Sequence, residues 1–294
     1  MAPGFHYGGQ ALIEGVMMRG PTDIGMSVRR PDGELETTRK RVPSIYSGRL
    51  RKMPLVRGII MLVETLVIGT QALMYSAEKA ASGEDGGEMP KGLLWLTVAA
   101  SLGFSVLLFF VLPLLVSRSL DAHIGSDFVS NLLEGVFRML IFVAYVAVIG
   151  LMRDVRRVFA YHGAEHRVIN AYEAGVPLTT EAVRSYSTSH TRCGTSFIFV
   201  VLVFSIIVLS LLGRPVLWLS ILSRIVLLPL IAAVSYEFIK WSADRQSNPV
   251  VHTLTAPGLL LQKLVTRAPD DGQIEAAIAA LRAVLEEPAG AKSA

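Results

Sequence analysis

Four long runs of apolar residues dominate the pattern of hydrophobic and polar positions along the chain. They cover residues 93–116, 128–151, 196–212 and 215–239. The first and third runs carry no charge, whereas the second contains Glu134 and Arg138 and the fourth contains Arg224. A helix needs roughly 20 apolar residues, with a range of about 17–25, to cross the hydrocarbon core of a bilayer. The pattern therefore predicts two pairs of membrane-spanning helices, at 93–151 and 196–239.

Basic residues are concentrated in three of the polar segments. Lys and Arg number twelve in residues 1–92, six in 152–195 and six in 240–294, but one in each of the short loops 117–127 and 213–214. Lys and Arg mark the cytoplasmic side of membrane proteins. Four spans with both termini in the cytoplasm place every basic segment on that side. The sequence thus predicts a multi-pass protein of the cytoplasmic membrane.

A fifth apolar segment, residues 55–76, carries Arg57, Glu64 and Gln71. A span here would move the basic N-terminus to the side opposite the other basic segments, against the same charge rule. We therefore expect 55–76 to form an interfacial or re-entrant helix. The following residues, 77–92, are rich in Gly and Glu, and predict a flexible acidic linker.

The composition agrees with a membrane protein. Hydrophobic residues make up 52% of the 294 residues and charged residues 18%, against about 25% charged residues in soluble domains. The formal net charge of +4 follows from membrane orientation, so we expect no sequence-specific nucleic-acid partner. A positive cytoplasmic face instead suits an anionic lipid or a protein partner, beside the lipid bilayer itself. The sequence leaves formation of a homo-oligomer open.

The polar segments predict local structure of their own. In residues 1–54, a Pro31-Asp32-Gly33 turn separates two alternating segments, which is typical of a β-hairpin. In the tail 240–294, apolar residues from Ile274 to Leu285 recur at helical spacing, so an amphipathic helix should dock on the cytoplasmic part. We expect a mainly α-helical polytopic membrane protein with about four transmembrane helices and a small β-rich N-terminal cytoplasmic segment.

The predicted cytoplasmic loop 152–195 contains the residues best suited to chemistry. His162 and His166 are four residues apart in a predicted helix and so share one face. Two imidazoles at this spacing can bind one metal ion. With Glu165 they form the pattern H-x-x-E-H of the inverted zinc peptidases, in which the Glu activates a metal-bound water.

A second cluster lies just before the third predicted span. It contains His190 and Cys193, the one cysteine of the chain, which also excludes an internal disulfide bond. Both clusters adjoin spans on the same side of the membrane, so they can meet. The sequence predicts a metal site formed by His162, His166, His190 and Cys193, and these nitrogen and sulfur ligands suit zinc better than calcium or magnesium.

The same residues allow several kinds of site. Four protein ligands would form a closed, structural zinc site, whereas three ligands and a water would form a catalytic one with Glu165 as the base. Cys193 could instead act as a nucleophile paired with a histidine. A loop without metal is a further alternative.

The chain resembles the YqhQ-like family of bacterial membrane proteins. The resemblance lies in residues 8–20, 162–166, 190–196 and 273–281 and covers nearly the whole chain. It implies a multi-span protein of the bacterial inner membrane, described in general terms as a predicted metal-dependent enzyme, and it names no substrate.

The leading hypothesis is a membrane-embedded zinc-dependent hydrolase of a peptidase-like kind, which acts on an amide or ester at the cytoplasmic surface. The alternative is a non-enzymatic membrane scaffold or accessory factor with structural zinc, which docks a ribosome, translocation machinery or anionic lipid. A channel using the intramembrane charges is a third hypothesis. Among those charges, Glu134 and Arg138 should pair, and Arg224 could be reached by Glu64.

Overall fold

The computed structural model describes residues 5–43, 48, 53–81, 91–213, 215–243 and 245–285. The strands are β1 (Gly8–Leu12), β2 (Gly15–Arg19), β3 (Asp23–Arg29) and β4 (Leu35–Arg41). The helices are α1 (Val56–Ala81), α2 (Lys91–Val106), the π-helix η3 (Leu107–Val111), α3 (Leu112–Ser119), the 3₁₀-helix η4 (Asp121–His123), α4 (Asp127–Ile149), α5 (Arg153–Glu173), α6 (Thr180–Arg184), α7 (Gly194–Ser210), α8 (Leu217–Ala243), α9 (Pro249–Val265) and α10 (Asp271–Leu285).

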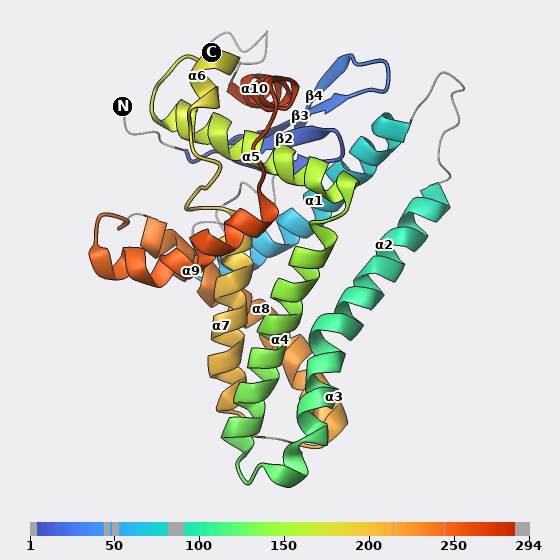
Figure 1. Ribbon diagram of the computed structural model, residues 1–294, viewed down its shortest axis with the longest axis vertical. Coiled ribbons are helices and arrows are strands. Elements are labelled where there is room, and N and C mark those ends of the chain that lie inside the picture. Colours follow the sequence, from blue (N-terminus) through green and yellow to red (C-terminus); the bar gives the residue numbers. More distant parts are fainter. Residues whose placement is uncertain are drawn as a thin grey trace.

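The four strands form an antiparallel sheet in the order β1-β2-β3-β4 (Figure 1). The predicted hairpin is confirmed, since β3 pairs with β4 across the Pro31-Asp32-Gly33 turn. In this turn the Asp32 carboxylate accepts a hydrogen bond from the Glu34 N–H at 2.9 Å. Gly33 has a φ of 89°, a left-handed conformation that favours glycine.

Helices cover both faces of the sheet. Side chains alternate between the two faces along each strand, so each face has its own apolar side chains against which a helix can pack. On one face, Met17, Met26 and other strand residues pack against Ile68 and Ala72 of α1. On the other face, Val16 and Met18 join a core formed with α5 and α10. The predicted docking of the C-terminal amphipathic helix is therefore confirmed, and it completes a three-layer unit.

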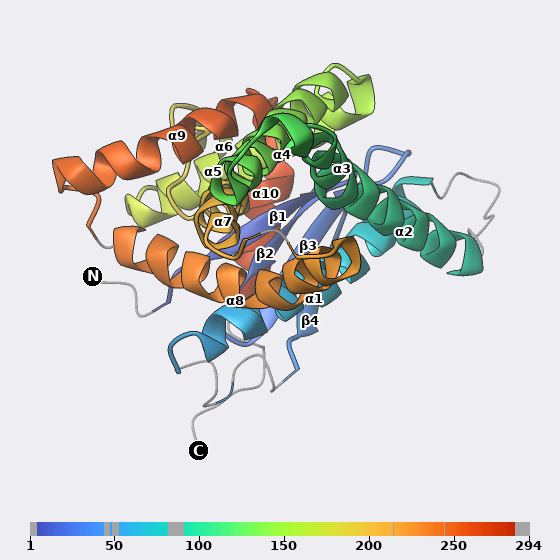
Figure 2. The same cartoon turned by 90° about the horizontal axis from the view of Figure 1, so that it is seen from below.

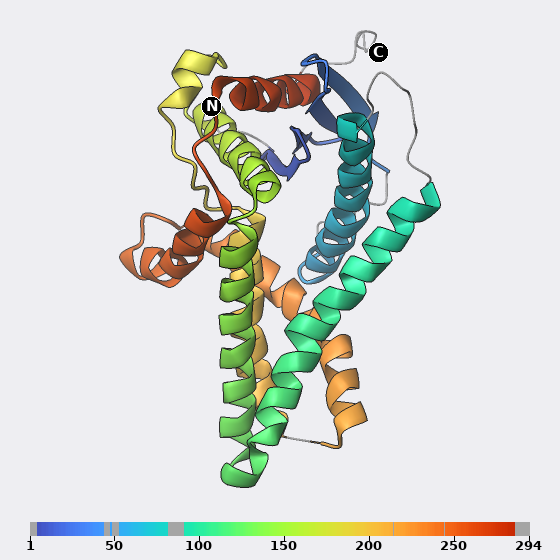
Figure 3. The ribbon, with the colours of Figure 1, turned by 45° about the vertical axis from the view of Figure 1, so that its right-hand side comes forward.

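An elongated helical part extends away from this three-layer unit. Helices α4 and α7 run along the long axis of the molecule, whereas the continuous α2–η3–α3 helix and α8 are tilted against it, and the α3–α4 and α7–α8 connections lie at the far end (Figures 1 and 3). Three of the four predicted spans are long apolar helices, Trp95–His123, Asp127–Ile149 and Leu217–Ala243. The third predicted span, 196–212, corresponds to α7, a shorter apolar helix of 17 residues and about 26 Å in length.

Helix α9 lies across the end of this helical part that is closest to the three-layer unit, at a steep angle to α4 and α7 (Figure 1). Seen from below, α9 lies to one side of α4 and α7, and α2 projects from the opposite side (Figure 2). Asn248 caps the N-terminus of α9 by accepting a hydrogen bond from the Val250 N–H at 2.9 Å. The structure thus places α9 where the three-layer unit meets the apolar helices.

Helix α1 covers the segment 55–76, for which we expected an interfacial or re-entrant helix. It is one continuous helix of 26 residues, long and apolar enough to cross a membrane, so it does not turn back as a re-entrant segment would. It also extends to Ala81, so the beginning of the predicted linker 77–92 is helical. The linker residues 82–90 lie outside the described residues. Polar groups of α1 bind the sheet: Glu64 accepts a hydrogen bond from Arg19 at 2.6 Å, and Ser76 from the Ile13 N–H at 3.2 Å.

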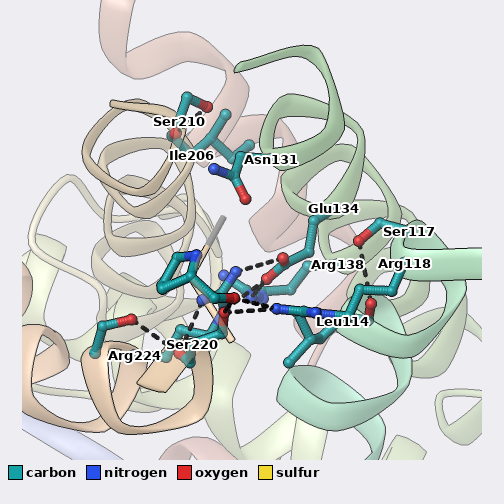
Figure 4. A network of polar contacts seen from close by, with 12 residues as sticks. Leu114, Ser117, Arg118, Asn131, Glu134, Arg138, Ile206, Ser210, Ser220 and Arg224 are labelled. Atoms are coloured by element: carbon teal, nitrogen blue, oxygen red, sulfur yellow. Dashed lines mark hydrogen bonds and ion pairs between the residues drawn. The ribbon is translucent and has the colours of Figure 1, made fainter. Parts of the chain in front are cut away.

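A buried ionic network joins the apolar helices near their far end (Figure 4). Glu134 accepts hydrogen bonds from Arg138 at 2.7 Å and from Arg224 Nε at 2.8 Å. Arg138 Nε also donates to the Phe109 carbonyl of the π-helix η3 at 2.9 Å. The predicted Glu134–Arg138 pair is confirmed, but the suggested Glu64–Arg224 pair is wrong, because Glu64 is bound to Arg19 in the three-layer unit.

Candidate metal centre

The turn between β1 and β2 fixes the position of α5, the helix that carries three predicted site residues. Arg157 Nη2 donates to Glu14 Oε2 at 2.7 Å, and the Tyr161 hydroxyl donates to the same oxygen at 3.3 Å. Burial raises the pKa of Tyr161 to about 12, and the negative charge of Glu14 acts in the same direction. The phenol therefore stays protonated and able to donate. These contacts hold α5 along the edge strand β1.

Three side chains of the types that bind metals converge beside the N-terminus of α7. His162 and His166 lie one turn apart on α5, and Cys193 comes from the loop before α7. Their ligand atoms all lie within 4.8 Å of one another, and Cys193 Sγ is 3.3 Å from His162 Nε2. Bonds from zinc to nitrogen and sulfur measure about 2.0–2.3 Å. A single ion between the three atoms can therefore reach all of them with small side-chain movements.

Hydrogen bonds to backbone carbonyls set the tautomer of both imidazole rings. His162 Nδ1 lies 2.9 Å from the Val265 carbonyl, and His166 Nδ1 lies 2.6 Å from the Thr188 carbonyl. A carbonyl oxygen can only accept, so each Nδ1 carries the proton. In a neutral ring with this tautomer, Nε2 is the nitrogen that can bind a metal. Metal-ligating histidines in proteins are oriented in this way by their second nitrogen.

Cys193 occupies the N-cap position of α7. Its Sγ accepts a hydrogen bond from the Thr195 N–H at 3.4 Å. The N-terminus of a helix favours negative charge, because its first backbone N–H groups have no partner within the helix. This position suits a thiolate ligand. The side chain is 6% exposed, so it is also shielded from solvent.

His190 does not belong to the three-residue group, although its ring lies beside His166 with the centroids 5.8 Å apart. His190 Nε2 is 3.5 Å from Glu173 Oε2, and its Nδ1 accepts a hydrogen bond from the Arg192 N–H at 3.4 Å. Burial acts to raise the pKa of Glu173, but the contacts with His190 and Arg192 outweigh it and lower this pKa. Both ring nitrogens of His190 are thus engaged away from Cys193.

Gln262 of α9 fixes the loop that carries His190 and Cys193. Its Nε2 donates to the His190 carbonyl at 2.8 Å and to Ser196 Oγ at 2.7 Å, and its Oε1 accepts from the His190 N–H at 2.9 Å. The side chain is completely buried. Sequence reasoning missed this residue and the carbonyl partners of the two histidines. The one available signal was a polar Gln within the apolar segment Leu259–Val265.

Glu165 lies on the side of α5 that faces β1. A Cβ atom at Gly9 would lie 3.1 Å from Glu165 Cδ and 2.4 Å from the Met17 carbonyl, so the strand approaches this closely because residue 9 is a glycine. Burial raises the pKa of Glu165 to about 7, opposed by the His162 ring and by a hydrogen bond from the Gly9 backbone. Glu165 is not part of the three-residue ligand group.

The predicted site residues are therefore brought together in part. His162, His166 and Cys193 form a group that could hold a metal ion, whereas the His190 ring lies beside His166 and Glu165 lies against Gly9 of β1. Imidazole and thiol donors in a tetrahedral arrangement are typical of zinc. A site with three protein ligands retains one position for water or substrate.

Residues 53–287 match a family described as "Protein of unknown function (DUF1385)". A relative from Bacillus subtilis (strain 168), described as "Uncharacterized protein YqhQ", is 32% identical in an alignment that covers 95% of this chain and 92% of the relative. No solved structure matches the chain. These descriptions assign neither an activity nor a metal, so the enzyme implied by the sequence resemblance remains a proposal. The extent of both matches shows that the chain belongs to the DUF1385 family.

Proposed function

We propose that this protein is a membrane-embedded, zinc-dependent hydrolase whose metal is held by His162, His166 and Cys193. The observation that carries the proposal is the convergence of two imidazole rings and one sulfur, with each Nδ1 within hydrogen-bond distance of a backbone carbonyl. When bound, zinc in such a site polarises a substrate oxygen and lowers the pKa of a water molecule.

Glu165 is the proposed proton acceptor. Its carboxyl group is buried, interacts electrostatically with the His162 ring and is held by the Gly9 backbone N–H. In the hydrolysis of an ester or amide, the water oxygen adds to the carbonyl carbon and the bond to the leaving oxygen or nitrogen breaks. Glu165 takes a proton from the water and returns it to the leaving group. Each reaction consumes one water and leaves the carboxyl group in its starting state.

The test combines metal analysis, X-ray absorption and turnover of fluorogenic esters and amides by the purified full-length protein. We expect stoichiometric zinc bound by two imidazoles, one sulfur and one oxygen, and turnover that stops when the metal is chelated. Glu165→Gln should keep the zinc and abolish turnover. If Glu165→Gln loses the metal as well, Glu165 is a ligand and the assignment as a base is wrong.

One observation favours a second function, a membrane scaffold with structural zinc. The His190 ring lies beside His166, so a rotation that breaks its contact with Glu173 would supply a fourth ligand and close the site. The same X-ray absorption experiment separates the two proposals. Four protein ligands, no bound oxygen and salt-sensitive co-purification with a large partner would support the scaffold.

A further inference from the structure

Helix α9 carries a stripe of exposed apolar side chains. Val250, Leu254 and Leu260 are 64%, 56% and 59% exposed, and Pro257 between them is exposed as well. Spacings of three and four residues place these side chains on one side of the helix. Apolar surface left in water costs about 25 cal/mol for each Å². The exposed stripe therefore favours a cover that the described part of the chain does not supply.

The other side of α9 is already packed against the rest of the protein. Its buried residues are Val251, Gly258, Leu261, Gln262 and Val265. Gln262 Nε2 donates to Ser196 Oγ at 2.7 Å, and a Cβ atom at Gly258 would lie only 3.2 Å from the same oxygen. Rotating α9 to bury the exposed stripe would break these contacts with α7. The stripe thus stays on the outside of the protein.

Helix α9 follows directly on a helix that can span the membrane. Helix α8 is long and apolar enough to cross a bilayer and ends at Ala243, and α9 begins at Pro249. Ile239 of α8 and Leu254 of α9 line the same small hollow, so the apolar surfaces of the two helices adjoin. Because α9 lies at a steep angle to α4 and α7, it runs close to the plane of the membrane surface (Figure 1).

Side chains typical of lipid headgroup level lie at both ends of α9. Trp241, near the end of α8, is 44% exposed, and the guanidinium carbon of Arg245 lies 5.3 Å from the centroid of its ring. Exposed tryptophans are enriched at the membrane–water interface. Exposed cations precede α9 at Lys240 and Arg245 and lie in its last turn at Lys263. Such cations are attracted to the phosphates of anionic lipids.

A second protein chain fits the exposed stripe less well than lipid does. Helix α9 has 17 residues, so a face about 26 Å long and about 10 Å wide offers roughly 260 Å². Each partner in a stable protein interface contributes about 800 Å². A bilayer needs no such minimum area, because its acyl chains also cover the adjoining apolar helices.

We propose that α9 is a membrane-docking helix, which lies in the plane of the phospholipid bilayer surface with Val250, Leu254 and Leu260 inserted among the acyl chains. The inference is independent of the proposed function, since none of its steps requires a metal. Docking also fixes the candidate metal centre beside the bilayer surface, because the Val265 carbonyl at the end of α9 lies 2.9 Å from His162 Nδ1.

The test uses nitroxide labels at Val250→Cys and Leu260→Cys of the full-length protein in vesicles of phosphatidylethanolamine and phosphatidylglycerol. Electron paramagnetic resonance then compares relaxation by oxygen, which concentrates in hydrocarbon, with relaxation by a water-soluble nickel chelate. We expect oxygen to dominate at both positions, at a depth of about 5–10 Å. The two depths should be similar, although the positions are about 15 Å apart along the helix.

His252→Cys is the matched control on the same helix. His252 is exposed but lies two residues from Val250 and Leu254, so it is on a different side of α9. Its ratio of oxygen to chelate relaxation should be roughly tenfold lower than that of the stripe positions. The unmodified chain gives the background, since its one cysteine, Cys193, is buried.

Three outcomes would overturn the proposal. Chelate access at Val250 and Leu260 equal to that at His252 would show that the stripe faces water. Low access of both reagents would show that a protein covers it. Depths that differ by about 15 Å would show that α9 crosses the bilayer instead of lying in its plane. Thermal unfolding in detergent identifies a label that disturbs the fold, and Leu254→Cys then replaces that position.

Discussion

Cys193 Sγ lies 3.3 Å from Nε2 of His162, although 31 positions separate the two residues. The contact depends on α5, which carries the histidine, and on the N-terminus of α7, which positions the sulfur. We expect His162→Ala and Cys193→Ala each to lose most of the bound zinc, because the remaining two ligands do not form a stable site. Metal analysis after dialysis measures this loss. His252→Ala, at an exposed histidine of α9, is the control and should keep its zinc. Full zinc occupancy in Cys193→Ala would contradict the ligand set.

Gln262→Ala should weaken the metal centre without removing a ligand. The substitution leaves the buried N–H and C=O of His190 without their partners, which costs about 1–3 kcal/mol for each unsatisfied group. Loss of support around metal ligands typically lowers metal affinity by about 10–100-fold. Competition with a zinc-binding dye measures the affinity, and thermal unfolding in detergent measures the stability. Gln246→Ala, which removes a hydrogen bond to Ser242 alone, should change neither.

Glu134→Gln tests the buried ionic network of the apolar helices. Arg138 and Arg224 are 3% and 7% exposed, so both would lose a carboxylate partner in a site from which water is excluded. Removing one partner from a buried ion pair costs about 3–5 kcal/mol. We expect a large fall in the unfolding temperature in detergent. Glu181→Gln, at an exposed carboxylate of α6, should have little effect.

A compensated variant distinguishes lost pairing from lost packing at the same place. Replacing Glu134 by Leu together with Arg138 and Arg224 by Met removes all three charges and retains similar volume. Buried ion pairs replaced in this way are often neutral or more stable. We expect the triple variant to recover most of the stability that Glu134→Gln loses. A triple variant as unstable as the single one would show that shape, rather than charge, dominates this site.

Much of the fold followed from periodicity because its largest features are local. The apolar runs, the Pro31-Asp32-Gly33 hairpin and the helical face ending at Leu285 each depend on neighbours in the sequence. The path of α1 depends on long-range contacts instead. Its hydropathy fits a span, but Glu64 and Ser76 bind groups of the sheet, and those partners become visible only when the strands are assembled.

In the candidate metal centre, too, local features could be predicted from the sequence and long-range contacts could not. Helical spacing predicted that His162 and His166 share a face. The separate roles of His190 and Cys193, three residues apart, depend on how the loop turns before α7, and spacing does not encode this turn. The contact of Glu165 with Gly9 joins a helix to a strand that precedes it by more than a hundred positions. Single-sequence patterns give no information on such a contact.

The contact between β4 and α1 predicts a dependence of stability on pH. The Lys79 ammonium, 2.8 Å from Glu36, lowers the pKa of that carboxyl group; burial opposes this effect, and the Tyr75 hydroxyl at 2.9 Å adds to it. A folded pKa below the unfolded value stabilises the protein at higher pH. This contribution, about 0.2–1 kcal/mol for such a pair, is lost as the pH falls below about 4.5.

Glu36→Gln is the variant for this prediction. It should lower the stability near neutral pH slightly and reduce the loss of stability on acidification. Thermal unfolding across the acidic range measures both effects. Glu34→Gln, at an exposed carboxylate of the preceding turn, should reproduce the pH profile of the unmodified protein. An unchanged profile in Glu36→Gln would mean that the pair contributes no pH-dependent stability.

The packing of the sheet against α5 and α10 predicts that α1 does not cross the membrane. The sheet and α5 share one core, so both must lie on the same side. Between β4 and α5 the chain contains α1, the α2–α3 helix and α4. If the last two each cross once, a crossing by α1 would make the total odd and separate the sheet from α5. We therefore expect α1 to lie at the membrane interface.

Cysteine labelling in intact cells tests this topology. A membrane-impermeant maleimide should label Gly125→Cys, at the far end of the apolar helices. Thr22→Cys in the sheet and Glu181→Cys in α6 should be labelled only after permeabilisation. The unmodified chain is the control, since buried Cys193 should react little in either case. Labelling of Thr22→Cys, but not of Glu181→Cys, in intact cells would place the sheet and α6 on opposite sides. Helix α1 would then have to span the bilayer, and the shared core of the sheet with α5 could not form.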